Sequence, residues 1–456
     1  MSQTPSKILI VGAGVLGLST ALALVQRPKY SQSNITVLDA ASEIPNSVAA
    51  SVDTSRVLRA DYALKAYTKL VSESQTLWGD QSVDGWGGEG RYHDAKLPGT
   101  QGHVDGYLEE SLENAKDLAR SGDYAVDLRG LRELPHREAI AHATLTGGAS
   151  GDFGYYNERC GWADAEKCVR YAIRTLQRRG GDRVSIKTNA GVRKLLYAPA
   201  DGAESTRCTG IELHDGSHVF ADLVILAAGA WTPSLVDLEG RAAATGQVLA
   251  YLPITEHEQR TMGSVPIYFN VSRGMFMVPP HNRELKVGRH GFGYQNPMKV
   301  SIPIPNPGGD LQFVEKMVSV PRTDLPIPLE AEKACKEFLV ELFPDWRNRQ
   351  FSKTRVCWYC DTPTGDFIID YYPRATGLFL ATGDSGHAFK ILPIIGEKVV
   401  DAIDGNLEPE YRELWKWKTN APGTFQGTND GTRGGRRDMI LQTEARTPTQ
   451  PRETHL

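Results

Sequence analysis

The chain has 456 residues, of which 40% are hydrophobic and 23% are charged, and its formal net charge is −4. This composition is typical of a globular protein with about three structural units. It excludes the strong basic field that nucleic-acid binding requires. The six cysteines are irregularly spaced, which argues against a disulfide framework and favours reduced thiols.

The first predicted elements form a βαβ unit. Residues 7–11 are a run of branched apolar side chains, typical of a strand that is buried on both faces. A glycine turn follows, then a helix predicted over residues 16–26 and a second buried strand over residues 34–40, which together imply a parallel sheet. The apolar run 8–25 is interpreted as folded protein, because it lacks the features of a signal peptide and contains too many small residues for a membrane span.

The glycine turn has the G-x-G-x-x-G pattern of a dinucleotide site, although a plain turn between strand and helix is the alternative. Gly12 permits the tight turn, Gly14 lets a pyrophosphate approach the backbone, and Gly17 lets the helix pack closely on the strand. Asp39 ends the next strand, where a carboxylate can accept hydrogen bonds from ribose hydroxyls. The predicted site also includes Val15, Leu16 and Ala40.

A second series of predicted elements begins with a helix over residues 164–181 and continues with strands within 183–197 and 208–230. The last of these strands runs into Gly229. A second strand that ends in glycine favours FAD over NAD, because flavoproteins use such a crossing to close over a long dinucleotide. A plain strand end is the alternative interpretation of Gly229.

Two segments rich in Pro, Gly, His and aromatic residues interrupt the βαβ order. We therefore expect an α/β fold with a Rossmann-like FAD-binding domain, a parallel sheet, and an inserted antiparallel-β substrate domain. The C-terminal stretch has too few apolar groups to offset its ordering entropy and is predicted to be an irregular tail. The predicted segments are 1–84, 153–245 and 350–418 for the FAD-binding domain, 85–152 and 246–349 for the substrate domain, and 419–456 for the tail.

Cys357 and Cys360 form a Cys-x-x-Cys pair inside a β-rich run. A zinc site would need two more closely spaced nitrogen or sulfur ligands, and a dithiol redox pair would be expected at a helix N-terminus. The sequence offers neither. From the residues alone, both thiols are best interpreted as small buried side chains.

Four segments in combination resemble the sarcosine-oxidase-like amine oxidases, a branch of the D-amino-acid-oxidase-type flavoproteins that includes pipecolate, saccharopine and fructosyl-amino-acid oxidases. These segments are "DTSRVLRADY" (53–62), "LKVGRHGFG" (285–293), "RVCWYCDTPTGDFIIDYYP" (355–373) and "GLFLATGDSGHAFKILPIIGEKVVDAI" (377–403). The resemblance extends to about residue 418. It implies that FAD is attached through a thioether between Cys357 and the flavin 8-methyl group, with Cys360 structural.

The resemblance also implies a reaction. The expected enzyme is an FAD-dependent oxidase of a secondary amine, such as an N-methyl or cyclic amino acid. It would transfer a hydride to flavin N5 and be re-oxidised by O2, which gives H2O2. Fructosyl-amino-acid or saccharopine oxidation, or a flavin dehydrogenase that passes electrons to a partner, are the alternatives. A non-catalytic dinucleotide-binding protein is disfavoured by the cations described next.

Several site residues follow from the matched positions. Arg59 and Lys390 match the pair that binds the substrate carboxylate, a role that suits charged hydrogen bonds. Lys286 matches a lysine above flavin N5 that stabilises the negative charge formed as O2 accepts electrons. His290 matches a position near the substrate, and Phe276 replaces a tyrosine that contacts small N-methyl amino acids. The alternatives are solvated arginines on a helix face, surface or strand lysines, and a structural histidine.

The remaining expected cofactor contacts are Ser55, Arg56, Val192, Asp384, Ser385, Gly386, His387 and Lys390. Arg56 matches an arginine near the flavin. We expect a monomer with no metal, nucleic-acid or membrane partner. The C-terminal "THL" is a weak variant of a peroxisomal address, so the expected location is the cytoplasm or the peroxisome.

Overall fold

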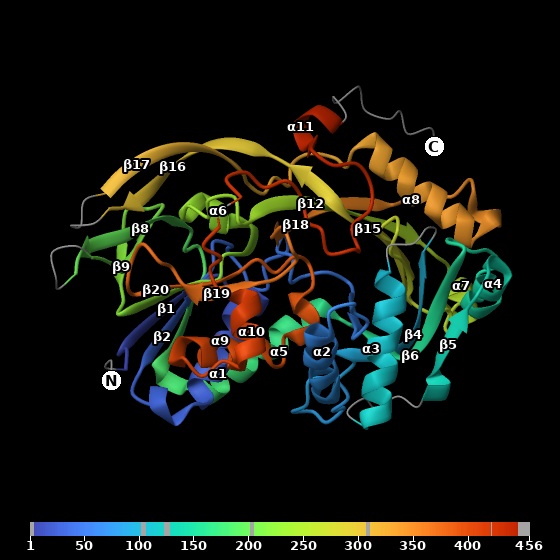
Figure 1. The fold of residues 1–456 in the computed structure, drawn as a ribbon, viewed down its shortest axis with the longest axis horizontal. Helices are drawn as coiled ribbons and strands as arrows, with labels where there is room; N and C mark the ends of the chain where they lie inside the picture. The colour runs from blue at the N-terminus through green and yellow to red at the C-terminus, as the bar shows by residue number, and fades with distance from the viewer. Residues whose placement is uncertain are drawn as a thin grey trace.

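Two large β-sheets, one mainly parallel and one mainly antiparallel, organise the computed structural model (Figure 1). The structure describes residues 4–101, 106–122, 128–200, 205–306, 311–420 and 422–445. The predicted α/β class, with a parallel sheet and separate antiparallel strands, is confirmed. No helix within these ranges is long and apolar enough to cross a membrane.

The first sheet has six strands in the order β19-β20-β11-β1-β2-β7, and only β19 runs antiparallel to its neighbour. The predicted strands lie at its centre, where Ile8 of β1 pairs with Ile35 of β2 and Leu223 of β11. The strands are β1 (Lys7–Val11), β2 (Asn34–Leu38), β7 (Val184–Lys187), β11 (Leu223–Leu226), β19 (Ile368–Tyr371) and β20 (Leu378–Thr382).

Both faces of this sheet are covered, which explains why its central strands are mostly apolar. Ile8 and Ile10 pack toward the helices α1, α5 and α9, whereas Leu9 and Val11 pack toward a three-stranded antiparallel sheet. Figure 1 shows the three helices together on one side of the sheet. Their bounds and those of the small sheet are α1 (Val15–Gln26), α5 (Ala165–Gly180), α9 (Ile395–Asp404), β8 (Val192–Pro199), β9 (Thr206–Leu213) and β10 (His218–Phe220).

The second sheet has ten strands in the order β18-β12-β15-β14-β13-β4-β6-β3, with β21 and β5 paired to β15 and β6. Three of them, β3, β6 and β18, come from segments that the sequence analysis placed in the FAD-binding domain, so this sheet joins both sets of segments. The strands are β3 (Arg56–Arg59), β4 (Tyr92–Gln101), β5 (Leu131–Leu134), β6 (Phe153–Ala163), β12 (Ala243–Pro253), β13 (Tyr268–Asn270), β14 (Met275–His281), β15 (Glu284–Gln295), β18 (Lys353–Asp361) and β21 (Met439–Ile440).

The other elements surround the two sheets (Figure 1). A long hairpin, β16 (Pro297–Pro305) with β17 (Leu311–Ser319), forms a separate two-stranded sheet. A short 3-10 helix, η6 (Ala388–Ile391), follows β20. The remaining α-helices of the described residues are α2 (Lys65–Trp78), α3 (Tyr107–Ser121), α4 (Arg137–Thr144), α6 (Thr232–Leu235), α7 (Glu256–Thr261), α8 (Leu329–Leu342), α10 (Pro409–Trp415) and α11 (Leu441–Glu444).

The C-terminal segment requires a correction. The sequence analysis expected 419–456 to lack the apolar groups needed for order, but residues 422–445 include β21 and α11 and pack against β15. Polar contacts hold this segment, because the side chain of Arg433 is only 1% exposed and pairs with Asp361 at 2.8 Å. The apolar content of a segment does not reveal buried ion pairs that can hold it in place.

Candidate active site

Two adjoining cavities lie between the sheets. The larger has a volume of about 740 Å³ and runs along the carboxyl ends of β1, β2 and β11. The smaller, of about 360 Å³, lies toward the ten-stranded sheet. Arg56, Tyr359, Gly386 and Phe389 line both cavities, so a ligand in one would meet the contents of the other at these residues.

The larger cavity has the backbone geometry of a dinucleotide site. Gly12 has φ +111°, and a Cβ there would lie 2.3 Å from the Ala227 carbonyl oxygen, so only glycine fits this turn. A Cβ on Gly17 would lie 1.9 Å from the Gly12 carbonyl oxygen, which explains the close packing of α1 on β1. A Cβ on Gly14 would meet only Ser51 Oγ, at 3.8 Å, so the glycine leaves open space beside the helix start.

The polar groups of this cavity suit a dinucleotide phosphate and ribose. Helix α1 has no side-chain cap at its N-terminus, so its first N–H groups are free for an anion. Asp39 accepts hydrogen bonds from the backbone N–H of Ala13 and Ala41 at 3.2 and 2.9 Å, which fixes its carboxylate at the cavity wall. The residues present therefore fit the adenosine and pyrophosphate parts of FAD.

The predicted cofactor residues divide between the cavities. Those lining the larger one are Gly12, Gly14, Val15, Leu16, Asp39, Ala40, Arg56, Val192, Gly229, Asp384 and Gly386. Those lining the smaller one are Arg56, Cys357, Ser385, Gly386, His387 and Lys390. Gly17 and Ser55 line neither, and the Ser55 carbonyl oxygen instead accepts a hydrogen bond from Lys286 Nζ at 2.7 Å.

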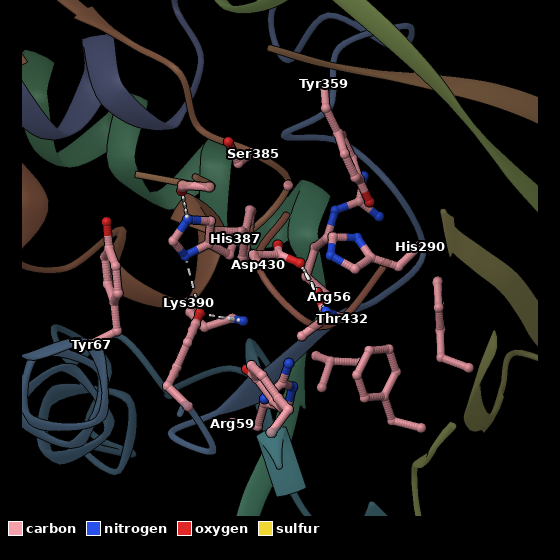
Figure 2. Close-up of a pocket in the computed structure, with 18 of the residues that line it drawn as sticks. Arg56, Arg59, Tyr67, His290, Tyr359, Ser385, His387, Lys390, Asp430 and Thr432 are labelled. Atoms are coloured by element: carbon pink, nitrogen blue, oxygen red, sulfur yellow. Dashed lines mark hydrogen bonds between the residues drawn. The ribbon is translucent and has the colours of Figure 1, made fainter. Parts of the chain in front are cut away.

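All the predicted substrate-site residues line the smaller cavity, although they come from distant parts of the chain (Figure 2). The two arginines lie on strand β3, not on a helix face. The other positions come from three further strands and from η6. The residues are Arg56 and Arg59 of β3, Phe276 of β14, Lys286 and His290 of β15, Cys357 of β18, and Lys390 of η6.

Arg59 and Lys390 are buried cations that form no ion pair with the residues the structure describes. The Arg59 guanidinium lies 4.8 Å from the ring centre of Phe269 and 5.3 Å from that of Tyr62. Lys390 Nζ donates to Tyr62 Oη at 2.8 Å, and burial together with the charge of Arg59 lowers the pKa of Lys390 well below its usual value. Neither forms an ion pair with a carboxylate among the described residues, although the nearby charge of Asp61 acts against burial to raise the pKa of both. A bound anion would further stabilise the charged form of both side chains.

A hydrogen-bonded chain holds Lys390 in place (Figure 2). His387 Nε2 lies 2.8 Å from the Gly365 carbonyl oxygen, and because a carbonyl only accepts, this nitrogen carries the proton. His387 Nδ1 therefore accepts from Tyr62 Oη at 3.1 Å. Burial and the charge of Lys390 lower the pKa of His387 to about 3, so its imidazole is neutral.

Lys286 differs from Arg59 and Lys390, because it forms an ion pair with a carboxylate. Its ammonium lies 2.7 Å from Asp53 Oδ2 and 5.9 Å from the centre of the Phe276 ring. Asp53 also pairs with Arg56 and accepts from Tyr251 Oη at 2.7 Å. Burial lowers the pKa of Lys286 to about 8, although Asp53 opposes this shift.

The two neighbouring cysteines have different surroundings. Cys357 is buried, lines the smaller cavity, and has its Sγ 3.7 Å from Arg56 Nη2. Cys360 lines neither cavity, and its Sγ accepts from Thr382 Oγ1 at 3.3 Å. All six cysteines are free thiols, and the described residues contain no cluster suited to a metal ion.

Sequence reasoning missed several polar residues of the site. Asp53 and Tyr62 lie within the matched segment 53–62, so their charge and hydroxyl could have been noticed there. Asp430 and Thr432 also line the smaller cavity, but no motif marks them, and they belong to the segment expected to be an irregular tail. The ring nitrogens of His290 form no hydrogen bond with the described residues, and the imidazole faces the cavity.

Comparisons with known proteins agree with this geometry. The family of FAD dependent oxidoreductases (DAO) matches residues 7–402. Amino acid oxidase imqH of Aspergillus flavus is 32% identical over 91% of this chain and 98% of that protein. L-saccharopine oxidase of Schizosaccharomyces pombe is 28% identical over 92% of this chain and 94% of that protein.

Among solved structures, the deglycating enzyme fructosamine oxidase (Amadoriase II) of Aspergillus fumigatus has a TM-score of 0.77, with 27% identity and 99% of each chain covered. These relatives confirm the resemblance to amine and amino-acid oxidases and the choice of FAD as cofactor. Because the match covers most of the chain and the larger cavity fits a dinucleotide, this chain belongs to the FAD dependent oxidoreductase family.

Proposed function

We propose that this protein is an FAD-dependent oxidase of a secondary amine that carries a carboxylate, an N-methyl or cyclic amino acid, and that O2 is the electron acceptor. The observation that carries this proposal is the pair of buried cations, Arg59 and Lys390, which lack a carboxylate partner in the described chain. The nearby carboxylate of Asp61 offsets only one of the two charges, and a buried cation is costly unless an anion such as a ligand carboxylate balances it.

The protein's own residues would orient the substrate. Arg59 can bind a carboxylate through two parallel N–H groups, and Lys390 adds a charge held in position by Tyr62 and His387. Phe269 and Phe276 give the cavity an apolar wall for the rest of the substrate. These residues would mainly orient the substrate, because FAD, when bound, would supply the acceptor for a hydride equivalent from the carbon next to nitrogen.

We also propose that FAD is tethered through Cys357. The thiol lines the smaller cavity, and its Sγ lies 3.7 Å from Nη2 of Arg56, a residue that lines both cavities. Cys360 is directed elsewhere, which leaves Cys357 as the thiol available at this point.

Lys286 is proposed to promote the reaction with O2. Its ammonium is buried beside the cavity, and a fixed positive charge stabilises the negative charge that forms when O2 accepts electrons. A monomer and a peroxisomal location remain predictions, and the C-terminal "THL" lies outside the described residues.

The test is a peroxide-coupled screen of the purified protein over sarcosine, pipecolate, saccharopine, fructosyl amino acids and N-methyl aromatic amino acids. We expect peroxide formation with one class and loss of that activity in Arg59→Met. Rapid flavin reduction by an amine followed by slow re-oxidation in air, with fast turnover of an artificial acceptor, would instead identify a dehydrogenase. A protein that binds FAD but is reduced by none of these amines would overturn the proposal.

A further inference from the structure

The C-terminal segment supplies a wall of the smaller cavity. Residues 428–434, here called the strap, are fixed on both sides. On one side Thr428 Oγ1 donates to the Thr362 carbonyl oxygen and Asn429 N donates to that of Pro363, both at 2.8 Å. On the other side Gly434 forms a β-bridge with Gly291 of β15. The strap is therefore anchored at both ends beside the smaller cavity.

The strap places one carboxylate, that of Asp430, at the cavity. Asp430 Oδ1 accepts from Thr432 N at 2.9 Å and from Thr432 Oγ1 at 2.8 Å, and Oδ2 accepts from Arg433 Nε at 3.2 Å. A carboxylate has about four acceptor positions, so one position on Oδ2 is free. Asp430 lines the cavity, with its side chain 20% exposed, so this position is open to a ligand.

The charge of Asp430 is only partly balanced. Arg433 is the cation nearest to it, but that guanidinium also pairs with Asp361, at 2.8 Å to Oδ1 and 3.2 Å to Oδ2. One cation is thus shared by two carboxylates, and the cluster has an excess negative charge. The charge of Arg433 holds the pKa of Asp430 well below its usual range despite burial, so this carboxylate is ionised throughout the functional pH range.

Opposite signs of charge therefore lie at two places in one cavity. Arg59 and Lys390 carry two positive charges near the single carboxylate of Asp61, and the strap has excess negative charge. In Figure 2 the labelled side chains of Lys390, His387, Arg59 and His290 are arranged around that of Asp430. Such a cavity is complementary to a zwitterion, in which a carboxylate and an ammonium group are separated by one carbon atom.

We propose that Asp430 binds the positively charged amino group of the substrate and so selects amino acids over carboxylic acids that lack nitrogen. This role rests on the proposed function, in which Arg59 and Lys390 bind the carboxylate. The charged and titratable groups that interact with Asp430 among the described residues are Arg433, Asp361, Asp366, His290, His387, Lys390, Tyr62 and Tyr107.

A carboxylate beside the substrate nitrogen would also affect the pH dependence of oxidation. The nitrogen lone pair is needed to expel the hydride, so a bound ammonium must lose its proton before oxidation. A carboxylate beside the nitrogen favours the charged form and raises the pKa of the bound amine. Replacing Asp430 by Asn should therefore weaken binding and at the same time shift the acidic limb of kcat to lower pH.

The test uses the FAD-loaded protein and two pairs of ligands that differ by one nitrogen: sarcosine against butanoate, and pipecolate against cyclohexanecarboxylate. Binding is followed anaerobically by the change in flavin absorbance, or by the concentration dependence of flavin reduction where the amine is oxidised. We expect the wild-type protein to bind the amino acid of at least one pair about 10- to 100-fold more tightly than its partner. Asp430→Asn should abolish this preference while butanoate and cyclohexanecarboxylate bind within about twofold of wild type.

Two further variants complete the design. Glu110→Gln removes an exposed carboxylate at the same cavity and should retain the wild-type preference. Asp430→Glu keeps the negative charge and should retain part of the preference for the amino acid. This variant keeps the role of Asp430 testable if Asp430→Asn loads FAD poorly.

Each remaining outcome would count against a different claim. The role of Asp430 would be overturned if Asp430→Asn bound both ligands of a pair more weakly by the same factor. It would also be overturned if the wild-type protein bound both ligands of each pair equally tightly. Failure of the wild-type protein to bind any of the four acids would instead overturn the proposed carboxylate site, and with it the proposed function.

Discussion

Lys286 is a buried cation whose charge depends on one carboxylate. Burial lowers its pKa to about 8, so the side chain is charged below that pH and loses its proton above it. If Lys286 promotes electron transfer to O2, we expect the re-oxidation rate of the reduced enzyme to fall as the pH rises through about 8. Stopped-flow mixing of reduced enzyme with O2 across this range measures the effect.

The variants that check this prediction separate charge from structure. Lys286→Met should re-oxidise slowly and without this pH dependence. Asp53→Asn should shift the fall to lower pH, because Asp53 raises the pKa of Lys286 against burial. A Lys286→Met enzyme that re-oxidises at the wild-type rate would remove Lys286 from the reaction with O2.

Lys390 illustrates how a single side chain would control substrate affinity. Replacing it with Met removes one charged hydrogen bond to the substrate carboxylate, so the KM of the amine identified by screening should rise about 10- to 100-fold. Lys416→Met is the matched control, because Lys416 forms only a surface pair with Glu413. Steady-state kinetics measure the KM of both variants. An unchanged KM in Lys390→Met would contradict the proposal that Lys390 binds the substrate carboxylate.

If FAD is attached to Cys357, the flavin should stay with the polypeptide when the protein is denatured. Acid precipitation of the wild-type protein should leave yellow flavin on the polypeptide, and Cys357→Ser should release it all to the supernatant. Cys360→Ala should keep the flavin attached, because that thiol contacts Thr382 and lines neither cavity. Flavin that stays attached in Cys357→Ser would show that another residue forms the bond.

At the scale of elements, the β1–α1 turn separates two roles of glycine. Gly17→Ala forces a methyl group against the Gly12 carbonyl oxygen and should destabilise the apoprotein by about 1–3 kcal/mol or more. Gly14→Ala meets only open space, so the protein should fold but bind less FAD, because the methyl group lies where a pyrophosphate would approach. Thermal unfolding and flavin content, measured on both variants, distinguish these effects.

The strap is the element whose order depends on buried charge. Arg433→Met leaves the carboxylates of Asp361 and Asp430 without their shared cation and should lower the free energy of unfolding by about 3–5 kcal/mol. Arg436→Met is the control, because that side chain is 67% exposed. Urea unfolding of the FAD-loaded proteins measures the difference, and equal midpoints for both variants would mean that other contacts hold the strap.

Across the whole molecule, the site lies where two sheets of different character meet. The six-stranded sheet offers the free N–H groups at the start of α1, and the ten-stranded sheet presents Arg59, Lys286 and Cys357 from three of its strands. A cofactor placed across the two cavities would contact both sheets at once. This arrangement explains how one ligand can connect a nucleotide site to a substrate cavity.

The sequence predicted the parts of this architecture that are encoded locally. Apolar runs gave the central strands, and the glycine spacing with Asp39 gave the turn, because burial pattern and turn chemistry involve residues only a few positions apart. Family resemblance supplied Arg59, Lys286 and Lys390, although no local pattern would have brought them together. The structure places all three in the smaller cavity.

By itself, then, the sequence determined the βαβ unit, the dinucleotide turn and the class of fold. Only the tertiary structure decided that Lys286 pairs with Asp53, that Lys390 is held by Tyr62, and that Asp430 reaches the cavity. The physical reason is separation along the chain. Contacts between residues hundreds of positions apart depend on how the sheets pair and close, and polar residues in a segment without apolar periodicity give no local sign of such contacts.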